Sequence, residues 1–347
     1  MRMKTHGGVK YGQYPYTVTR VKVMRSSLLT PQDYLKMHNM GFNEIARMLE
    51  EGEYREDINK YSGKHSGIEL IEVAIKENFA RTIQKLLFIS TREVRELIQT
   101  YSLKWLLHNF KLIMKVKMGI LDSDEMTILQ IPLKPTTYSF SRELLREEME
   151  EIIKRIASRV PIDQKELLDY VEQKDVIGLE NAIDRAYYKN LQALVKRMAL
   201  GRKDPLKRLL SDVIALTNIK TIIRLKSKKV NQEKIKAALI PMPGRSLIKK
   251  LVEADNLHAT LEILRESSFA VLGDARVEED IALLENLSEQ YLFRYAFILL
   301  HRSPLSVSSV FGFMLLKEIE VRNLRIFIHA KTLGLDKEFI DSTIVVN

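Results

Sequence analysis

The stretch LLKEIEVRNLRIFIHAK, residues 315–331, decides the fold because it recurs. From Asn323 it reads Asn, apolar, basic, any, apolar, apolar, basic or His, any, Lys, and the same pattern occupies 109–117 and 218–226. The three asparagines lie 109 and 105 residues apart, close to a third of the 347-residue chain. A repeat of this period predicts three related structural units.

Each copy has the periodicity of a helix that is buried on most sides. At about 100° per residue, its apolar positions sweep roughly 240°, whereas the apolar stripe of a surface helix is not much wider than about 100°. The asparagines Asn109, Asn218 and Asn323 fall inside this apolar arc. A buried polar group without a partner costs about 1–3 kcal/mol, so we predict that each asparagine is structural and hydrogen-bonded within its unit.

Two basic positions, four residues apart, share the narrow polar edge of each copy. They are Lys111 with Lys115, Lys220 with Arg224, and Arg325 with His329. Like charges at this spacing weaken an isolated helix, so an acidic group should lie opposite, either in this chain or in a partner protein. With two arginines of the N-terminal helix, the candidate partner-interface residues are Arg20, Arg25, Lys111, Lys115, Lys220, Arg224 and Arg325.

Composition narrows the class of protein. Apolar residues make up 46% of the chain, enough for a substantial core, and cysteine is absent. A disulfide framework and a thiolate metal site are therefore excluded. The longest purely apolar runs are far shorter than the roughly 20 residues of a membrane span. The N-terminus has no apolar segment, so it does not resemble a secretory signal.

The net charge of +10 is unevenly distributed, with +8 in 1–121, +4 in 122–230 and −2 in 231–347. A basic first third favours an acidic partner, nucleic acid or an anionic membrane surface, while a solvated lysine-rich surface is the alternative. A helical-repeat scaffold that binds nucleic acid should present a continuous basic face. The acidic last third argues against that function, and we expect no nucleic-acid partner.

The chain order predicts an all-α fold, since alternating period-2 strands are essentially absent. We expect a flexible tail over 1–13, followed by repeats over 14–121, 122–230 and 231–347. The helix expected over 14–29 partly resembles the repeated helix, which would make the chain a circularly shifted set of three units. Further helices are expected over 32–50, 68–100, 141–159, 163–174, 178–200, 205–229, 245–270 and 276–302, with a polar loop over 59–67 and an irregular section over 121–141.

A second feature recurs upstream of each asparagine. An apolar residue is followed one turn later by an aromatic, 34, 35 and 36 residues before the repeat Asn. The pairs are Ile75 with Phe79, Ile183 with Tyr187, and Leu287 with Tyr291.

Motifs that carry chemistry are missing. The chain has no GxxxxGK[ST] phosphate loop, no GxGxxG and no HExxH. Ser246 and Lys249 match SxxK, but its usual companion motifs are absent. We therefore predict no catalytic site, cofactor, metal site or direct nucleotide binding.

Four segments, in order, resemble one known family. They are Tyr14-x-Tyr16-x-x-x-Arg20-Val21-Lys22-x-Met24-Arg25-Ser26-x-Leu28-Leu29, then 179–188, then Asp212 to Lys226, then Pro304-Leu305-Ser306 with 316–325. Together they are similar to the C subunit of archaeal-type rotary ATP synthases, the counterpart of the vacuolar d subunit. The resemblance runs from about Tyr14 to the C-terminus. Residues 1–13 and the basic excess of the first third depart from the family pattern.

The resemblance implies a non-catalytic rotor subunit. Three similar helical domains would surround a pseudo-threefold axis and form a funnel or socket at the foot of the central stalk. The shaft, made by subunits D and F, would seat in the socket, and the opposite face would rest on the proteolipid ring at the cytoplasmic side of the membrane. A generic adaptor with an unrelated partner is a further alternative.

Overall fold

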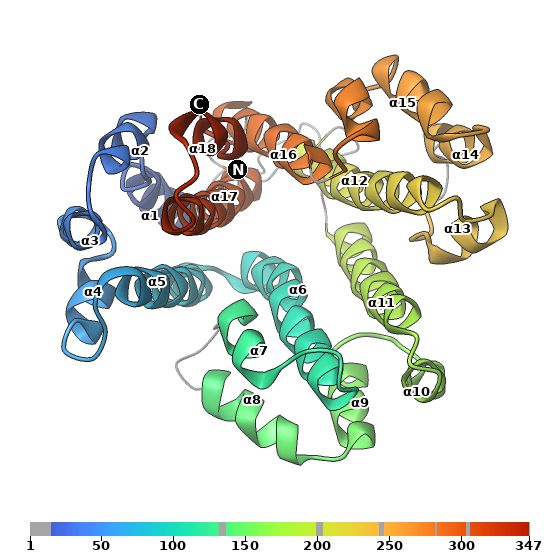
Figure 1. Ribbon diagram of the computed structural model, residues 1–347, viewed down its shortest axis with the longest axis horizontal. Coiled ribbons are helices and arrows are strands. Elements are labelled where there is room, and N and C mark those ends of the chain that lie inside the picture. Colours follow the sequence, from blue (N-terminus) through green and yellow to red (C-terminus); the bar gives the residue numbers. More distant parts are fainter. Residues whose placement is uncertain are drawn as a thin grey trace, which may run out of the picture. The chain divides into compact units, whose positions relative to one another are not determined.

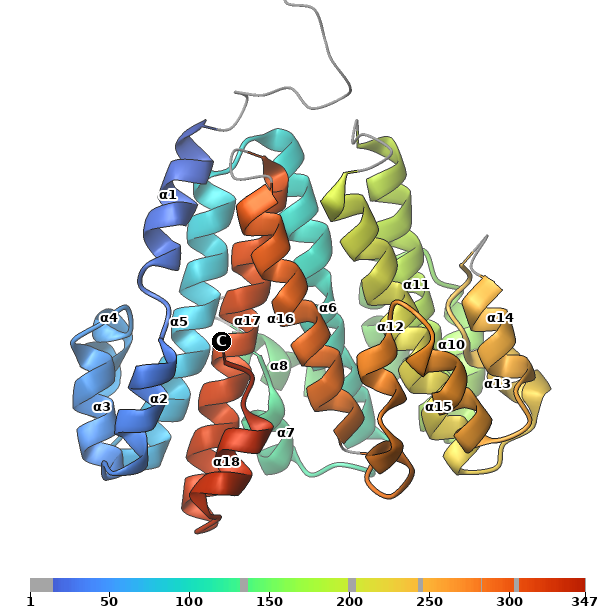
Figure 2. The ribbon, with the colours of Figure 1, turned by 90° about the horizontal axis from the view of Figure 1, so that it is seen from above.

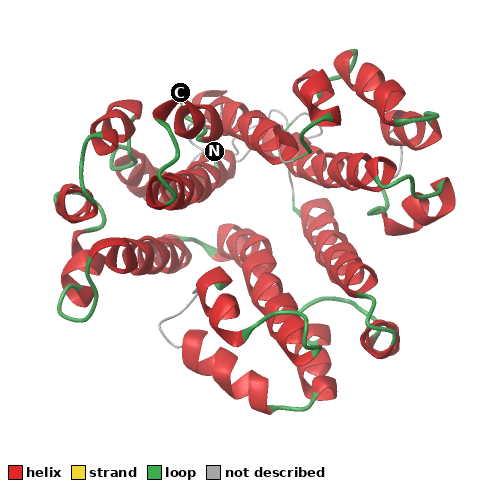
Figure 3. Ribbon diagram, viewed as in Figure 1, coloured by secondary structure: helices red, strands yellow, loops and turns green. Residues whose placement is uncertain are grey.

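A computed structural model of the protein describes residues 15–131, 137–198, 204–242, 246–281, 283–302 and 306–346. Every regular element in these ranges is a helix (Figure 3), which confirms the predicted all-α class. The predicted tail, 1–13, lies outside the described residues. Within the described ranges, no helix combines the length and the apolar character needed to cross a membrane.

The described residues form two compact units. Unit 1 takes its residues from Glu96–Ile131 and Thr136–Tyr291, and unit 2 takes its residues from Lys10–Arg95 and Leu292–Asn347. Two long helices, α6 and α16, contribute residues to both units. The division of the chain into three repeats stays a prediction.

Unit 1 contains two successive series of helices (Figure 1). The first series is α6 (Arg92–Lys117), α7 (Ser123–Leu129), α8 (Thr137–Arg146), α9 (Met149–Ala157), α10 (Gln164–Glu172) and α11 (Val176–Arg197). The second is α12 (Pro205–Ser227), α13 (Gln232–Ala238), α14 (Ser246–Glu253), α15 (Leu257–Arg265), the 3₁₀ turns η1 (Ala270–Gly273) and η2 (Ala275–Glu278), and α16 (Leu283–Arg302).

Unit 2 joins the two ends of the described chain. Its helices are α1 (Pro15–Arg25), α2 (Pro31–His38), α3 (Phe42–Glu50), α4 (Arg55–Tyr61), α5 (Gly67–Ile89), α17 (Val307–Thr332) and α18 (Lys337–Thr343). Helices α5 and α17 run alongside each other, and α1 packs on both (Figure 2).

Helices of the same lengths accompany the repeated helices in both units. Each long repeated helix (α6, α12, α17) is followed by a seven-residue helix (α7, α13, α18). A nine-residue helix comes two elements later in unit 1, as α9 and α15. In unit 2 the nine-residue helix is α3, which precedes α17 in sequence.

A single apolar core joins these helices in unit 2, although they are far apart in the sequence. Tyr34, Met37 and Ile45 of α2 and α3 pack in one buried cluster with Phe327 of α17 and Ile340 of α18. The N-terminal segment therefore supplies the apolar partners that the C-terminal repeated helix needs.

The three repeated helices end in the same way. Gly119, Lys229 and Gly334 have φ of +70°, +56° and +68°, and each lies two residues past the end of its helix. At the C-terminus of α17, the amide of Gly334 donates to the carbonyl of Lys331 (3.2 Å), and the amide of Leu335 donates to the carbonyl of Ala330 (3.0 Å). This is the Schellman arrangement. It places one residue in the left-handed conformation, which glycine adopts without a steric penalty because it has no Cβ.

Several expected boundaries were wrong. The helix expected over 68–100 breaks at Ser90, whose backbone is extended (φ −93°, ψ 144°), and the Arg95 guanidinium donates to the carbonyls of Leu87 and Ser90 there. The helix expected over 32–50 likewise breaks before Gly41, the N-cap of α3.

Two segments expected to be irregular contain helices. The section 121–141 holds α7, because the Asp122 side chain accepts a hydrogen bond from the Ser123 amide and caps the helix. The polar loop expected over 59–67 begins later, since α4 continues to Tyr61. In both segments the sequence prediction overlooked a seven-residue helix, because its apolar periodicity spans too few residues to be recognised.

Candidate functional site

Each repeat asparagine is buried and hydrogen-bonded to one residue further along the chain. In α6, the Asn109 amide nitrogen donates to the Ile131 carbonyl (2.7 Å), and the Ile131 amide donates to Asn109 Oδ1 (3.0 Å). In α12, Asn218 exchanges the same two bonds with Ile240 (2.9 and 2.8 Å). In α17, Asn323 does so with Val345 (2.7 and 2.9 Å).

The partner lies 22 residues beyond the asparagine in all three copies. It is also the second residue past the seven-residue helix, in the segment that leaves α7, α13 or α18. An asparagine amide offers a donor and an acceptor together, so it pairs with a peptide as another backbone would. Each asparagine thereby attaches the segment after the short helix to the long helix.

The lysine at the ninth position of the repeated pattern also makes an equivalent contact in each copy. Lys117 Nζ donates to the carbonyl of Glu147 (2.6 Å), just past α8. Lys226 donates to the carbonyl of Ala254, just past α14. Lys331 Nζ donates to the carbonyl of His38 (2.7 Å), the last residue of α2. A cation at a helix C-terminus is stabilised by the unpaired carbonyls and the helix dipole.

In α6, the basic candidates face acidic residues of this chain. Lys111 Nζ lies 2.9 Å from Asp184 Oδ1, and Lys115 Nζ lies 2.5 Å from Glu180 Oε1. Both acids belong to α11. The four side chains are 16–39% exposed, so these ion pairs link two helices of unit 1 at a partly solvated seam.

In α12, both basic candidates share one acid. Lys220 Nζ lies 2.9 Å from Glu285 Oε2, and Arg224 bonds the other oxygen of the same carboxylate. Burial would raise the pKa of the Glu285 carboxyl, but the two cations outweigh it and hold that pKa below its usual range. Glu285 belongs to α16, so this pair also lies within unit 1.

In α17, the two positions behave differently. His329 Nε2 lies 2.8 Å from Glu72 Oε1 of α5. Arg325 has Lys76 of α5 as its electrostatic neighbour, and that lysine is 8% exposed. Burial, together with the positive charge of Arg325, lowers the pKa of Lys76 to about 8, against an opposing contribution from Glu72.

The two candidates of the N-terminal helix α1 lie in unit 2. Arg20 is exposed. Arg25 is half-buried, and its guanidinium carbon lies 5.6 Å from the ring centre of Phe297. Such a cation–π contact is worth about 0.5–1 kcal/mol at an exposed site.

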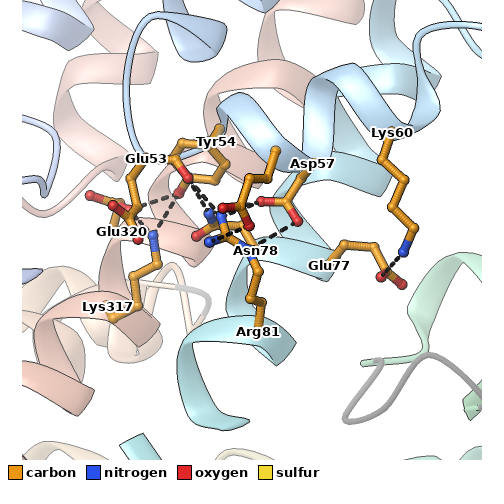
Figure 4. A network of polar contacts seen from close by, with 10 residues as sticks. Glu53, Tyr54, Asp57, Lys60, Glu77, Asn78, Arg81, Lys317 and Glu320 are labelled. Carbon is orange, nitrogen blue, oxygen red and sulfur yellow. Dashed lines mark hydrogen bonds and ion pairs between the residues drawn. The ribbon is translucent and has the colours of Figure 1, made fainter. Parts of the chain in front are cut away.

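A buried charge network in unit 2 was not predicted (Figure 4). Lys317 Nζ lies 2.6 Å from Glu320 Oε1, and both residues are at most 5% exposed. The Tyr54 hydroxyl accepts from Lys317 (3.1 Å) and donates to Glu320 Oε1 (2.7 Å). The other Glu320 oxygen accepts from the Leu29 amide at 2.6 Å. One carboxylate therefore holds the start of α4 and the segment before α2 against α17.

The network continues on α4 and α5 (Figure 4). Asn78 and Arg81 both donate to the Glu53 carbonyl and to Asp57 Oδ2, at 2.8–3.0 Å. Nearby, Lys60 Nζ lies 3.6 Å from Glu77 Oε2. The only sequence signal for these contacts was the pair Lys317 and Glu320, charged residues three apart within the mostly apolar stretch 315–331.

Comparison with known proteins identifies relatives of nearly full length. The family described as ATP synthase (C/AC39) subunit matches residues 17–343. The A-type ATP synthase C subunit of Methanosarcina barkeri is 30% identical over 96% of this chain and 93% of its own length. The C subunits of the A-type ATP synthases of Methanosarcina acetivorans and Archaeoglobus fulgidus are each 28% identical, over 96% of this chain and 93% and 96% of their own lengths.

The match spans both compact units and all three copies of the asparagine pattern. It confirms the resemblance carried by the four segments of the sequence. The chain belongs to the ATP synthase (C/AC39) subunit family.

Proposed function

We propose that this chain is the non-catalytic central-stalk subunit of an A-type rotary ATP synthase. It acts as a socket between the proteolipid ring and the shaft formed by subunits D and F, at the cytoplasmic face of the membrane. It transmits torque while ATP synthesis or hydrolysis is coupled to ion transport. Support comes from relatives named as C subunits of A-type ATP synthases, aligned over 96% of this chain.

The observation that carries the proposal is the order of the ion pairs. The repeated helix α6 pairs with α11, α12 pairs with α16, and α17 pairs with α5. Each repeated helix thus contacts the long helix that precedes the next repeated helix, since α11 precedes α12 and α16 precedes α17. The last repeated helix, α17, contacts α5, which precedes the first repeated helix, α6. This cyclic order supports the proposed pseudo-threefold funnel.

The contacts also suit a part that carries torque. Such a part must resist deformation, and packed interiors are stiff whereas isolated helices are marginal. Three buried asparagine pairs and three lysine contacts attach the short helices to the long ones. No step of catalysis is assigned to any of these residues.

The nucleic-acid alternative has less support. Lys111, Lys115, Lys220 and Arg224, which would have to face phosphates, each contact a carboxylate of this chain. Nucleic-acid affinity that falls steeply with salt would be its signature, because phosphate contacts release counterions.

Co-purification tests the proposal. The full chain, tagged, is mixed with purified subunits D and F and, separately, with the proteolipid ring in detergent. We expect retention of both, and retention of neither would overturn the proposal. A duplex DNA fragment at low salt serves as the control ligand, and we expect it to be left unbound.

A further inference from the structure

We propose that Arg325 and Arg322 of α17, beside Lys76 of α5, form a binding site for a carboxylate side chain of a partner protein in the complex. The inference rests on the proposed function for the identity of that partner. It concerns one position at which the third repeat differs in charge from the other two.

Helices α5 and α11 are equivalent in register around this position, whereas Glu285 of α16 lies two residues before the matching Leu287. Lys76 directly follows Ile75, and Asp184 directly follows Ile183, the matching residue of the second copy. The neighbouring acids correspond as well, since Glu72 and Glu180 each precede that isoleucine by three residues. Glu72 pairs with His329 as Glu180 pairs with Lys115.

The charge at the remaining position is reversed. Two residues past the repeat asparagine, Lys111 meets Asp184 and Lys220 meets Glu285, each at 2.9 Å. The third member, Arg325, instead has Lys76 as its electrostatic neighbour. Whatever else Lys76 contacts, a lysine cannot supply the carboxylate that the other two copies have.

Arg322 adds a further cation to the same face. It lies three residues before Arg325, and side chains at that spacing are neighbours on a helix. Arg322 Nη1 and Arg325 Nε are buried and have no hydrogen-bond partner among the described residues. Both residues are partly exposed as a whole, so the pair lies at the protein surface.

The local electrostatics favour an anion. Burial lowers the pKa of Lys76 most, and the positive charge of Arg325 lowers it further, against an opposing contribution from Glu72. An incoming carboxylate would offset the positive charge of Arg325 and accept charge-assisted hydrogen bonds from the guanidinium groups. A guanidinium also matches a carboxylate in geometry, because it offers two parallel N–H donors.

A carboxylate of a protein partner fits better than other anions because the chain already uses this solution twice. In the first two copies the group opposite the basic position is an aspartate or a glutamate. The partner would supply the third, so the chain would complete its set of ion pairs only in the assembled complex.

Binding of purified subunits D and F, and of the proteolipid ring, to the full chain tests the inference. We expect Arg325→Gln to weaken one of these interactions about ten- to hundredfold, the loss typical of a hydrogen bond to a charged group. Lys76→Asp should weaken the same interaction, because it supplies an internal carboxylate to Arg325. Lys220→Gln is the matched control, since Glu285 still pairs with Arg224 in that variant. The variant should bind subunits D and F and the proteolipid ring with the affinity of the wild type.

Thermal unfolding separates loss of binding from loss of folding. Lys76→Asp should still unfold cooperatively, because its carboxylate can pair with Arg325, and yet bind the partner more weakly. If the wild type binds and neither Arg325→Gln nor Lys76→Asp changes that binding, the inference is overturned and the proposed function stands. A wild-type chain that binds neither partner would overturn both.

Two further ligands test the source of the anion. Millimolar inorganic phosphate, and vesicles of anionic phospholipid, are offered to the wild type and to Lys76→Asp. We expect no stabilisation or binding that differs between the two proteins. A difference would assign the site to a free oxyanion or a lipid headgroup and would overturn the proposed protein partner.

Discussion

Asn323 and Val345 exchange two hydrogen bonds, of 2.7 Å from the side-chain amide and 2.9 Å to its oxygen, although 22 residues separate them. Asn109 with Ile131 and Asn218 with Ile240 repeat this exchange at the same separation. The relationship explains why an asparagine occupies an otherwise apolar arc. It also shows that each asparagine attaches the segment after the seven-residue helix to the long helix.

Replacing Asn323 with leucine should destabilise unit 2. The substitution leaves the buried amide and carbonyl of Val345 without partners, and each unsatisfied group costs about 1–3 kcal/mol. We therefore expect the free energy of unfolding to fall by about 2–4 kcal/mol, measured by urea denaturation. Asn59→Leu, at an exposed position of α4, should change it little. A value for Asn323→Leu equal to that of this control would refute the structural role.

Removing one member of the buried pair Lys317 and Glu320 should be more damaging than neutralising both. Lys317→Met leaves the Glu320 carboxylate buried with only the Tyr54 hydroxyl and the Leu29 amide. Loss of one partner of a buried ion pair typically costs about 3–5 kcal/mol. The double variant Lys317→Met with Glu320→Gln should recover part of that loss, because the glutamine oxygen can still accept from Leu29.

A double-mutant cycle measured by urea unfolding checks this expectation. The two single variants and the double variant together give the coupling energy between the side chains. Additive losses, with no recovery in the double variant, would show that Lys317 and Glu320 do not act as a pair.

Lys229→Gly should stabilise unit 1. Lys229 holds φ +56° at the position where the other two copies have Gly119 and Gly334. A left-handed conformation costs a non-glycine residue about 1 kcal/mol or more, so we expect a gain of about 1 kcal/mol, reduced by the entropy glycine adds to the unfolded chain. The reverse change, Gly334→Ala, should lower stability by a similar amount, since a Cβ there meets nothing within 4 Å and only the backbone conformation is affected.

Thermal denaturation of both variants beside the wild type tests this reciprocal pair. The melting temperature should rise for Lys229→Gly and fall for Gly334→Ala. Shifts of the same sign would contradict the explanation from backbone conformation.

Stability should rise with pH through the titration of Lys76. Its pKa is about 8 in the folded protein, against an ordinary value of 10.5, because burial and Arg325 disfavour the charged form. Between these two values the unfolded chain holds more protons than the folded one, so the free energy of unfolding increases with pH. The full gain is about 3 kcal/mol by linkage.

Comparison with Lys76→Met isolates this effect, because all other titrating groups are shared. We expect the wild type to gain stability relative to the variant between pH 8 and 10.5, the window set by the two pKa values. Parallel pH profiles for the two proteins would show that Lys76 titrates normally.

Periodicity was sufficient to predict the all-α class and the repeated helices, because helical spacing is a local property of the chain. It was less reliable for short elements. Helix α7 depends on the Asp122 cap rather than on a long apolar pattern, and the break at Ser90 depends on the Arg95 side chain that closes the preceding helix. Caps of this kind involve only one or two residues, so sequence patterns locate them poorly.

The sequence by itself determined the three copies of the asparagine pattern, the buried arc of each helix and the family to which the chain belongs. Tertiary structure decided which group each buried polar side chain meets. Asn323 could have bonded anywhere in its unit, and Arg325 had no partner assigned by spacing. Glu320 binds the amide of Leu29, 291 residues away, because hydrogen bonds and ion pairs depend on proximity in space, whereas periodicity records only neighbours along one helix.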